Sequence, residues 1–432
     1  MAKITINQLG PIQYCNLEID ELMVFTGPQS SGKSTIAKSV FLFKNVKNIL
    51  VQLLRKQHML NDDAANLTLG MSLKNRLIRE LRSNFLQIFG TTWCMSQSMF
   101  LKYEYKEDVW IRISLKDDQL SPNYIWLEFS RKLLDFLGEL EERFGAGLLV
   151  LNFDIQDTLK QTINQFFSDE LEIIYIPAGR SMMTLLSTQL NYIYSMMDDL
   201  QRRSIDYCTQ NYIERILQLK PFFSVSLEEL VKSRKELTDQ KLDANLLKKT
   251  IDLIKKILRG EYRNIDGEER LQVSQNRYVK INFASSGQQE AVWILNVLFY
   301  YLLQGKKAHF IVEEPESHLY PDAQKLMTEF IALVKNAGNQ IVLTTHSPYI
   351  LGTLNNLLYA NKISKQVDKE KLHRIINRDR WLDFEKLSAY YVGDGQCRSC
   401  VDSEFQAIEN EMIDGASEDI NRDYDRMLVL NE

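Results

Sequence analysis

Cysteines, long apolar runs and excess positive charge are all scarce in this chain of 432 residues. Its five cysteines (Cys15, Cys94, Cys208, Cys397 and Cys400) are too few for a disulfide framework, which indicates a reducing compartment. No apolar run reaches the length of about 18 residues that a membrane span needs, and residues 1–6 lack the apolar core of a signal peptide. We therefore expect a cytoplasmic protein. The net charge of −5 does not by itself indicate nucleic-acid binding.

A glycine-rich segment near the N-terminus fits the pattern G-x-x-x-x-G-K-[ST]; it consists of Gly27, Pro28, Gln29, Ser30, Ser31, Gly32, Lys33 and Ser34. It lies between a predicted strand at 22–26 and a predicted helix at 33–57, so the alternative of a chance glycine turn is disfavoured. Backbone N–H groups of the loop and of the helix N-terminus, including Thr35, would surround phosphate oxygens. Lys33 would contact the β- and γ-phosphates, and the Ser34 hydroxyl would ligate Mg²⁺.

Two further apolar strands end in polar side chains. Residues 309–314 end in Glu313 and Glu314, and residues 340–346 end in His346. A carboxylate at the end of a buried strand is unfavourable unless it binds a cation or a proton. We assign Glu313 to the Mg²⁺ shell, mainly through water, and Glu314 to the general base that activates water. His346 would hydrogen-bond the γ-phosphate; the alternatives are a polar turn after 314 and a structural histidine.

Residues 284–290 read Ala-Ser-Ser-Gly-Gln-Gln-Glu and lie at a predicted strand-to-helix junction. Ser285, Ser286, Gly287 and Gln288 would offer hydroxyl and N–H groups at a helix N-terminus, which is a second anion site. One ATP already has its own phosphate loop, so a second site is explained if it contacts the ATP of a second subunit. The alternative is an ordinary serine N-cap.

The pattern of strands and helices predicts an α/β fold with a mixed sheet. Residues 99–130 alternate as an antiparallel β-meander, residues 185–258 have helical periodicity, and strands alternate with helices over 287–357. We predict four parts: an N-terminal lobe at 1–180, an inserted helical arm at 181–275, a C-terminal lobe at 276–360, and an extension with an acidic helical end at 361–432.

The four motif segments, at 27–34, 284–290, 309–314 and 340–346, resemble in their order those of the head of ABC-type P-loop ATPases. The strings at 313–321 (Glu-Glu-Pro-Glu-Ser-His-Leu-Tyr-Pro) and 344–348 (Thr-Thr-His-Ser-Pro) are similar to the RecF, SMC and OLD-type branch, which includes ATPases of anti-phage systems such as Septu and PARIS. The resemblance covers about 1–60, 99–180 and 276–360. It implies that two heads enclose two ATP molecules. Each ATP would be bound from one subunit by Lys33, Ser34, Glu313, Glu314 and His346, and from the other subunit by Ser285 and Gly287. Residues 315–320 would contact the partner.

The sequence departs from the pattern of that family at several positions. Glu313 stands where an Asp is usual, Ala284 and Ser286 replace a Leu and a Gly, and Tyr320 lies near the place of a missing Asp. The longer arm of Glu313 would change the geometry of Mg²⁺ binding and slow turnover. Gln97 is a candidate for the glutamine of the Q-loop.

Function follows from the resemblance. The chain is expected to bind and hydrolyse ATP as a homodimer or a higher oligomer. It is expected to sense or regulate a separate nuclease or toxin in anti-phage defence. The alternatives are a RecF- or SMC-like DNA repair ATPase and a nucleotide-gated scaffold with little hydrolysis.

Four weaker features allow more than one interpretation. Cys397 and Cys400 have zinc-knuckle spacing but no second pair, which favours free thiols. Basic residues at 230–259 form either a solvated face or a DNA contact. Arg180 would either face phosphate or brace the sheet. The acidic residues at 402–432 favour a solvated helix over a docking surface for a partner, and we expect no Toprim nuclease domain there.

Overall fold

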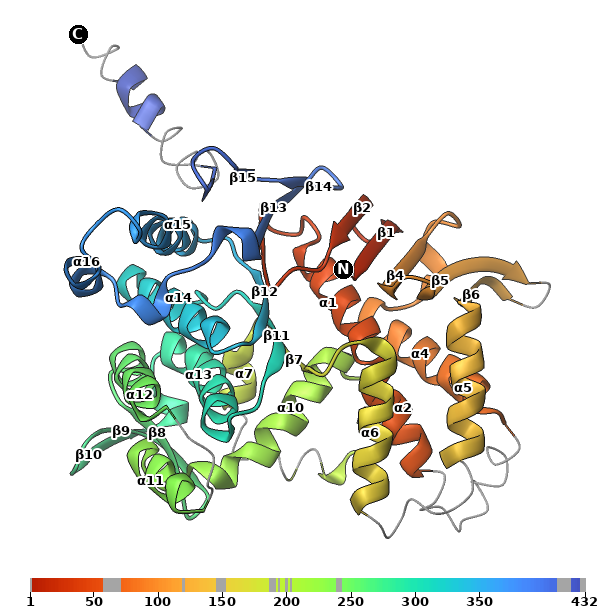
Figure 1. Ribbon diagram of the computed structural model, residues 1–432, viewed down its shortest axis with the longest axis horizontal. Coiled ribbons are helices and arrows are strands. Elements are labelled where there is room, and N and C mark those ends of the chain that lie inside the picture. The colour runs from red at the N-terminus through yellow and green to blue at the C-terminus, as the bar shows by residue number, and fades with distance from the viewer. Residues whose placement is uncertain are drawn as a thin grey trace.

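The computed structural model describes residues 2–56, 71–118, 121–144, 153–185, 204–237, 243–409 and 421–427, with short pieces at 192, 195–198 and 201–202. Figure 1 shows a long sheet between two groups of helices, α2, α4, α5 and α6 on the right and α11 to α16 on the left. Two extensive hydrophobic cores correspond to this division.

The main sheet has eleven strands in the order β6-β5-β4-β1-β2-β14-β13-β3-β12-β11-β7. Their bounds are β1 Lys3–Leu9, β2 Ile12–Glu18, β3 Leu22–Thr26, β4 Phe100–Lys106, β5 Val109–Asp118, β6 Ser121–Phe129, β7 Glu172–Ile176, β11 Ala308–Glu313, β12 Gln340–Thr344, β13 Leu387–Gly393 and β14 Gln396–Ser399. The mixed α/β class and the antiparallel meander of β4, β5 and β6 are as predicted.

The sheet is antiparallel at one end and parallel at the other. Strands β13, β3, β12, β11 and β7 pair in parallel. Strands β3, β12, β11 and β7 are buried on both faces: in β3, Met23 and Phe25 pack into one core, and Leu22 and Val24 pack into the other. This two-sided burial explains why the parallel strands appear in the sequence as continuous apolar runs, whereas β4 alternates between buried and partly exposed residues.

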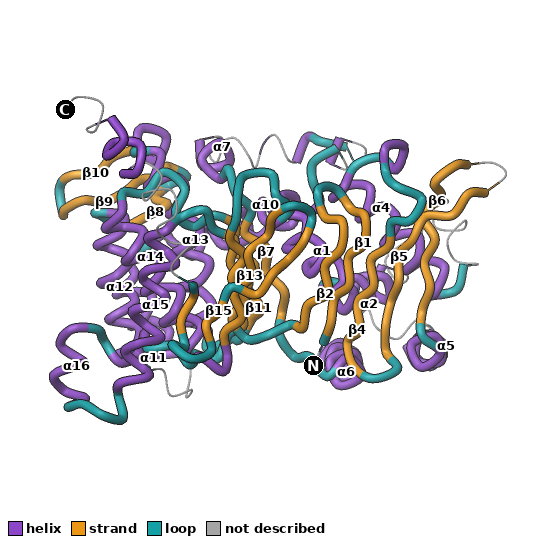
Figure 2. The backbone as a smooth tube through the Cα atoms, turned by 90° about the horizontal axis from the view of Figure 1, so that it is seen from above, coloured by secondary structure: helices purple, strands orange, loops and turns teal. Residues whose placement is uncertain are grey.

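Helices cover both faces of the sheet, as Figure 2 shows from above. Their bounds are α1 Lys33–Lys44, α2 Val46–Lys56, α4 Leu73–Phe89, α5 Arg131–Phe144, α6 Phe153–Phe167, α7 Arg180–Leu185, α10 Tyr207–Leu219, α11 Leu227–Leu237, α12 Ala244–Leu258, α13 Ser286–Gln304, α14 Pro321–Asn336, α15 Pro348–Ile363 and α16 Lys369–Ile375. The single helix predicted for 33–57 is divided at Asn45, where α1 ends and α2 begins.

A second, three-stranded sheet lies beside α12 and leads into α13. It consists of β8 Glu261–Ile265, β9 Glu268–Ser274 and β10 Arg277–Lys280. The residues predicted as a helical arm therefore include strands as well as α10, α11 and α12. A short hairpin of β15 Val401–Asp402 and β16 Ala407–Ile408 follows β14.

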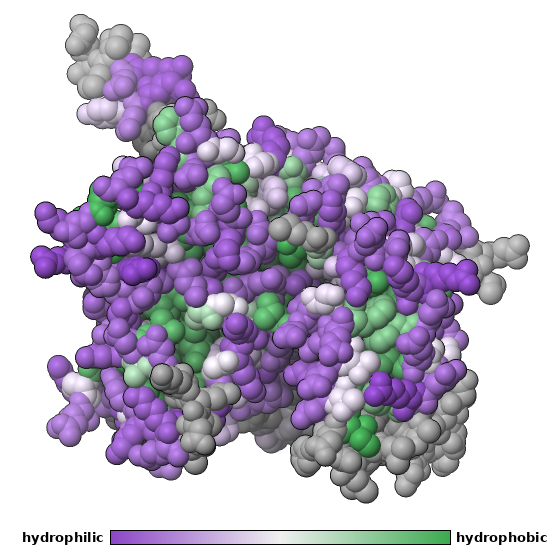
Figure 3. Space-filling view, in the orientation of Figure 1, coloured by the Kyte–Doolittle hydropathy of each residue, from purple (hydrophilic) through white to green (hydrophobic). Residues whose placement is uncertain are grey.

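Figure 3 shows a mostly hydrophilic face interrupted by separate hydrophobic patches. Among the described residues, none of the helices combines the length and apolar character needed to cross a membrane. The acidic segment near the C-terminus is described only at 402–409 and 421–427, and its remaining predicted helical residues lie outside the described part of the chain.

Candidate functional site

Four chain segments meet at the carboxyl ends of neighbouring parallel strands. In the order β3-β12-β11-β7, these strands lead into the glycine-rich phosphate loop (27–34), His346, the acidic pair (Glu313 and Glu314) and Arg180 respectively. The carboxyl edge of an open parallel sheet is where α/β proteins place ligand-binding groups. The structure thus brings together residues that are up to about 300 positions apart in the sequence.

The phosphate loop requires glycine at both of its glycine positions. Gly27 has φ 138°, and a Cβ there would lie 2.2 Å from the carbonyl oxygen of Val392. Gly32 has φ 110°, and its Cβ would lie 2.4 Å from Ile12 Cδ1. Helix α1 begins directly after Gly32, and no side chain caps its N-terminus. Its first backbone N–H groups are therefore available to an anion.

Lys33 is the first residue of α1 and its side chain folds into the loop. Its Nζ donates to the carbonyl oxygens of Gly27 at 3.0 Å and Pro28 at 2.7 Å. Burial lowers the pKa of Lys33, and the charges of Glu314, Glu316 and Glu313 oppose that shift. The ammonium group therefore lies within the electrostatic reach of the acidic segment, although the two segments come from different strands.

Glu314 is linked to Lys33 through His346. Lys33 Nζ lies 3.4 Å from His346 Nδ1, and His346 Nε2 lies 3.1 Å from Glu314 Oε1. Because a lysine ammonium can only donate, Nδ1 accepts, and a neutral imidazole then donates from Nε2 to the carboxylate. This chain of contacts orients the Glu314 side chain. Its backbone is also unusual, with φ 42°, and its N–H donates to the carbonyl of Thr344 at 2.9 Å.

Glu313 is buried and incompletely satisfied. Its Oε2 accepts the N–H of Ala178 at 3.1 Å, whereas its Oε1 has no hydrogen bond of good geometry within the described residues. Burial, followed by the charge of Glu313, raises the pKa of the nearby Tyr175. A buried carboxylate oxygen without a hydrogen-bond donor fits a cation.

The residues present fit Mg²⁺ better than a metal held by protein ligands alone. In the described part of the chain, His, Cys, Asp and Glu form no group of three or more that could hold a metal. Mg²⁺ usually takes one or two protein ligands together with waters and substrate phosphates. Glu313 and the Ser34 hydroxyl would be those ligands. Among the described residues no cluster of cysteine and histidine could hold zinc, and Cys397 contacts Cys15, with 2.7 Å between the sulfur atoms.

Glu316, which the sequence placed only within the stretch 315–320 expected to contact a partner, is buried beside the site. Its Oε1 accepts the Thr345 hydroxyl and the His346 N–H, each at 2.7 Å, and it is buried, which raises its pKa. It fixes the backbone on which the His346 ring is mounted. The third carboxylate in the Glu-Glu-Pro-Glu string was a signal, but only the fold shows which backbone it supports.

Helix α13 begins in the segment predicted as a second anion site. Ser285 is its N-cap, and a capping box joins Ser285 to Gln288. The side chains of Ser285 and Ser286 are exposed, whereas Gly287 is buried where a Cβ would lie 2.5 Å from the carbonyl oxygen of His318. The segment therefore contains an ordinary serine N-cap, and it also presents two accessible hydroxyl groups.

The remaining candidates separate clearly. The guanidinium of Arg180 is fully buried and donates to backbone carbonyls, so it braces the sheet. Gln97 donates to Asp117 at 2.8 Å, which ties it to the end of the meander. The segment after β7 also contacts the acidic pair, because the backbone N–H of Ala178 donates to the Glu313 carboxylate.

The parallel sheet, the glycine loop and the uncapped helix N-terminus define a P-loop nucleotide-binding protein. A family model described as "AAA ATPase domain" matches residues 1–351, and the chain belongs to this family of ATPases. No curated protein sequence matches the chain.

Several solved structures are similar to the chain at low identity. The SMC head domain from Thermotoga maritima is 12% identical, with 92% of this chain and 97% of that chain covered and a TM-score of 0.36. An Smc head from Pyrococcus furiosus, bound to the C-terminal domain of ScpA, is 11% identical, with 98% and 100% covered and a TM-score of 0.38. A dimeric ATP-binding cassette bound to ADP and Pi is 11% identical, with 92% and 97% covered and a TM-score of 0.31.

Proposed function

We propose that this ATPase closes as a homodimer around two ATP molecules, hydrolyses them through Glu314, and regulates a separate effector, a nuclease or toxin, in anti-phage defence. The observation that carries the catalytic part is the chain of contacts from Lys33 through His346 to Glu314. It joins a phosphate-binding lysine to a carboxylate across two neighbouring strands. The regulatory part rests on the resemblance to ATPases of defence systems.

The proposed reaction uses side chains that the fold already holds in place. Lys33 and the N-terminal N–H groups of α1 bind the β- and γ-phosphates. Glu314 accepts a proton from the attacking water. His346 holds this carboxylate in position through its single N–H, and it would donate that N–H to the γ-phosphate once Glu314 releases it. Mg²⁺, when bound by Ser34 and Glu313, would neutralise charge on the phosphates. The longer arm of Glu313, compared with an aspartate, is the reason to expect slow turnover.

The dimer is supported by what lies exposed near the second helix N-terminus. Ser285 and Ser286 are accessible, and three large aromatic side chains lie within a few residues of the site: Phe283 is 78% exposed, Tyr320 73% and Tyr349 53%. Exposed aromatic residues are enriched at protein interfaces. A second copy that covers them would bring Ser285 and Gly287 to the opposite ATP, with residues 315–320 in the same contact.

Replacement of the general base tests the catalytic part. Glu314→Gln should lower kcat by about 10²–10⁴-fold, because the amide cannot accept the proton. It should also accumulate an ATP-bound dimer, measured by light scattering after size-exclusion chromatography. Glu128→Gln, an exposed carboxylate on β6 that pairs with Lys116, is the control. Unchanged turnover in Glu314→Gln would remove Glu314 from its role.

The effector is tested separately. When the ATPase is expressed from its native operon and purified, a nuclease or toxin should co-purify with it. The activity of that effector should change with ATP or with Glu314→Gln. Recovery of the ATPase alone from cells challenged with phage contradicts the regulatory part and leaves the catalytic part standing. A single-turnover assay distinguishes the hydrolase from the nucleotide-gated scaffold, because the scaffold would bind ATP and form product only at the background rate.

A basic cleft favours a DNA-responsive ATPase as a second candidate function. The cleft, of about 680 Å³, lies between the end of α12 and the sheet of β8 and β9, and is lined by Lys255, Arg259, Arg263 and Arg270. Arg263, Arg270 and Lys280 lie directly opposite one another across the three strands. Like charges in such a row destabilise a sheet unless anions compensate them.

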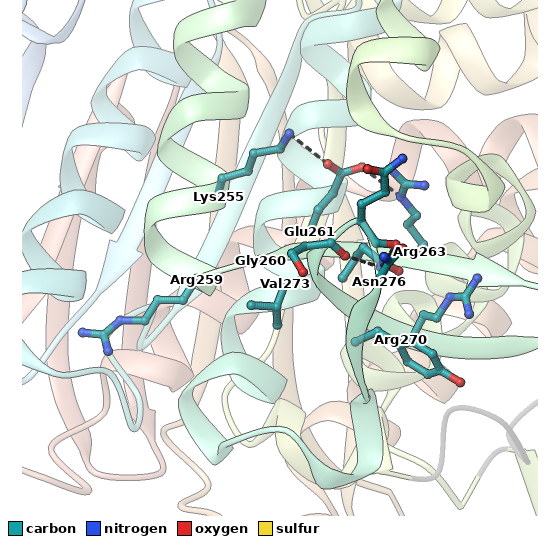
Figure 4. Close-up of a pocket in the computed structure, with 12 residues that line it drawn as sticks. Lys255, Arg259, Gly260, Glu261, Arg263, Arg270, Val273 and Asn276 are labelled. Atoms are coloured by element: carbon teal, nitrogen blue, oxygen red, sulfur yellow. Dashed lines mark hydrogen bonds and ion pairs between the residues drawn. The ribbon is translucent and has the colours of Figure 1, made fainter.

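Most of these charges have carboxylate partners, but the central one does not. Glu261 pairs with Lys255 at 3.1 Å, as Figure 4 shows, and with Arg263 at 3.3 Å; Glu268 pairs with Lys280 at 2.5 Å. Arg270 forms no ion pair with a described carboxylate, and its guanidinium lies 4.6 Å from the centre of the Tyr278 ring. An unpaired arginine next to an exposed aromatic ring suits a phosphodiester backbone.

Salt-dependent binding tests this candidate. Arg270→Ala should weaken binding of a single-stranded oligonucleotide and reduce the slope of log K against log salt by about one. The control is Arg112→Ala on β5, where the guanidinium also lies over an aromatic ring, that of Phe100, at 4.5 Å. If wild-type protein neither binds DNA nor hydrolyses ATP faster in its presence, the DNA-responsive alternative is wrong.

A further inference from the structure

Arg180 connects the acidic pair to the helix that carries the second anion site. It follows β7, begins α7, and is fully buried. Its guanidinium donates to the carbonyl oxygens of Glu313 at 2.7 Å, Glu314 at 2.9 Å and Glu290 at 3.1 Å, and also to that of Pro177. One side chain therefore holds the ends of two strands and a turn of α13 in a fixed relation.

Glu290 completes the connection from the side of α13. It is 1% exposed and lies three residues after Gly287. Its carboxylate accepts the backbone N–H groups of Arg180 at 3.0 Å and Ser181 at 2.8 Å, and Arg180 Nε lies 3.3 Å from Glu290 Oε2. The Thr184 hydroxyl adds a bond to the carbonyl of Gln289 at 2.9 Å. The first turns of α13 and α7 are thus tied together.

Stability alone does not account for this arrangement. A buried ion pair is often no more stabilising than well-packed apolar side chains of similar volume, because both charges lose their hydration. The planar arginine offers several donors in fixed directions, and a lysine cannot reproduce them. The carbonyl of Glu314 that it binds belongs to a residue with φ 42°, so the guanidinium holds the unusual turn that aims the Glu314 side chain.

We propose that Arg180 is a positioning residue that couples α13 to Glu314. Contact of Ser285 and Gly287 with the ATP of a second copy would shift the start of α13, and Glu290 and Arg180 would pass this shift to the backbone of Glu314. Hydrolysis at one ATP then depends on occupancy of the other. This inference rests on the proposed function, since it needs a dimer with two ATP molecules.

The experiment compares two buried carboxylates of equal charge. Glu290→Gln keeps the shape of the side chain and removes the charge that faces Arg180. Glu269→Gln is the control, because Glu269 forms a similarly buried ion pair with Lys220, at 3.0 Å, away from the acidic pair. For each variant, kcat, KM, the ATP-concentration dependence of turnover, nucleotide affinity and Tm are measured.

Coupling predicts a specific pattern. Glu290→Gln should lose roughly 10- to 100-fold in kcat, as expected for a misplaced catalytic group. It should lack the sigmoidal dependence on ATP that the coupling predicts for wild type, keep its ATP affinity, and lower Tm by no more than Glu269→Gln. Arg180→Lys should show the same kinetic defect, since it retains the charge without the fork, and it serves as the second variant if Glu290→Gln does not fold.

The failures are distinguishable. If Glu314→Gln traps no dimer, the proposed function fails and the coupling fails with it. If that dimer forms but Glu290→Gln and Arg180→Lys keep wild-type kcat and ATP dependence, only the coupling is overturned. A parallel loss of kcat and Tm in Glu290→Gln and Glu269→Gln also overturns it, because the ion pair is then merely structural.

Discussion

The N-termini of α1 and α13 are built in opposite ways. Helix α1 follows Gly32, which has no side chain to cap it, and its N–H groups remain available. Helix α13 follows Ser285, whose hydroxyl and backbone are engaged with Gln288 in a capping box, while Gln288 also donates to the carbonyl of Leu258 at 2.7 Å. Both positions were predicted as anion sites, and they differ in that only the N-terminus of α1 lacks a side-chain cap.

The difference indicates an order of events. An uncapped N-terminus beside Lys33 can bind phosphate without rearrangement, so a single chain should bind ATP. At α13 a phosphate has to compete with the capping bonds of Ser285 and Gln288. Such competition is favoured only when a second copy adds further contacts, so we expect the α13 site to act in the dimer and to be weak in the monomer.

Loss of Lys33 should give the largest effect, because it breaks the open site. Lys33→Ala should abolish ATP binding, since it removes the only lysine that folds into the phosphate loop in the described structure. Binding of a fluorescent ATP analogue measures this directly. Lys38→Ala, further along α1 and paired with Asp206 at 3.1 Å, should retain affinity. Equal affinity in Lys33→Ala and wild type would sink the loop assignment.

An alanine at Gly287 should damage the capped site. Its Cβ would lie 2.5 Å from the carbonyl oxygen of His318, a backbone atom that cannot rotate away. Overpacking of this kind lowers the free energy of unfolding by about 1–3 kcal/mol, and it should weaken ATP-dependent dimerisation while monomeric ATP binding persists.

The same substitution elsewhere provides the control for Gly287. A Cβ at Gly352, inside α15, meets no atom within 4 Å. Gly352→Ala should therefore stabilise the protein by up to about 1 kcal/mol through helix propensity. Calorimetry and light scattering measure both variants. Similar behaviour of the two would mean that the close approach of Gly287 to His318 has no function.

Removal of the Ser285 hydroxyl should give the smallest effect on stability. Ser285→Ala should lower the free energy of unfolding by about 1 kcal/mol, the usual value for loss of an N-cap. If the hydroxyl also contacts the second ATP, the dimer of Glu314→Gln should weaken further in the double variant. Asp243→Ala, which removes the N-cap of α12, controls for the cap alone. Equal dimer affinity with and without the Ser285 hydroxyl would mean that Ser285 acts only as an N-cap.

The sequence predicted which segments form the site, but it did not predict which of their side chains contact one another. Gly27 to Ser34, the acidic pair and His346 could be identified because each polar segment follows a short apolar strand, and local pattern is sufficient for that. The roles of Glu316 and Arg180 could not be assigned, because their partners come from other strands: Glu316 holds Thr345 and His346, and Arg180 reaches the carbonyls of β11.

By itself, the sequence determined which backbone stretches are strands, which are helices, and where phosphate can bind, since apolar periodicity and glycine placement are local properties. Only the tertiary structure decided which ends are neighbours, that one helix N-terminus is open and the other capped, and that Lys33, His346 and Glu314 form a chain. Those facts depend on strand order and on side chains that meet across the sheet, and these bring together residues too far apart in the sequence for a local pattern to relate them.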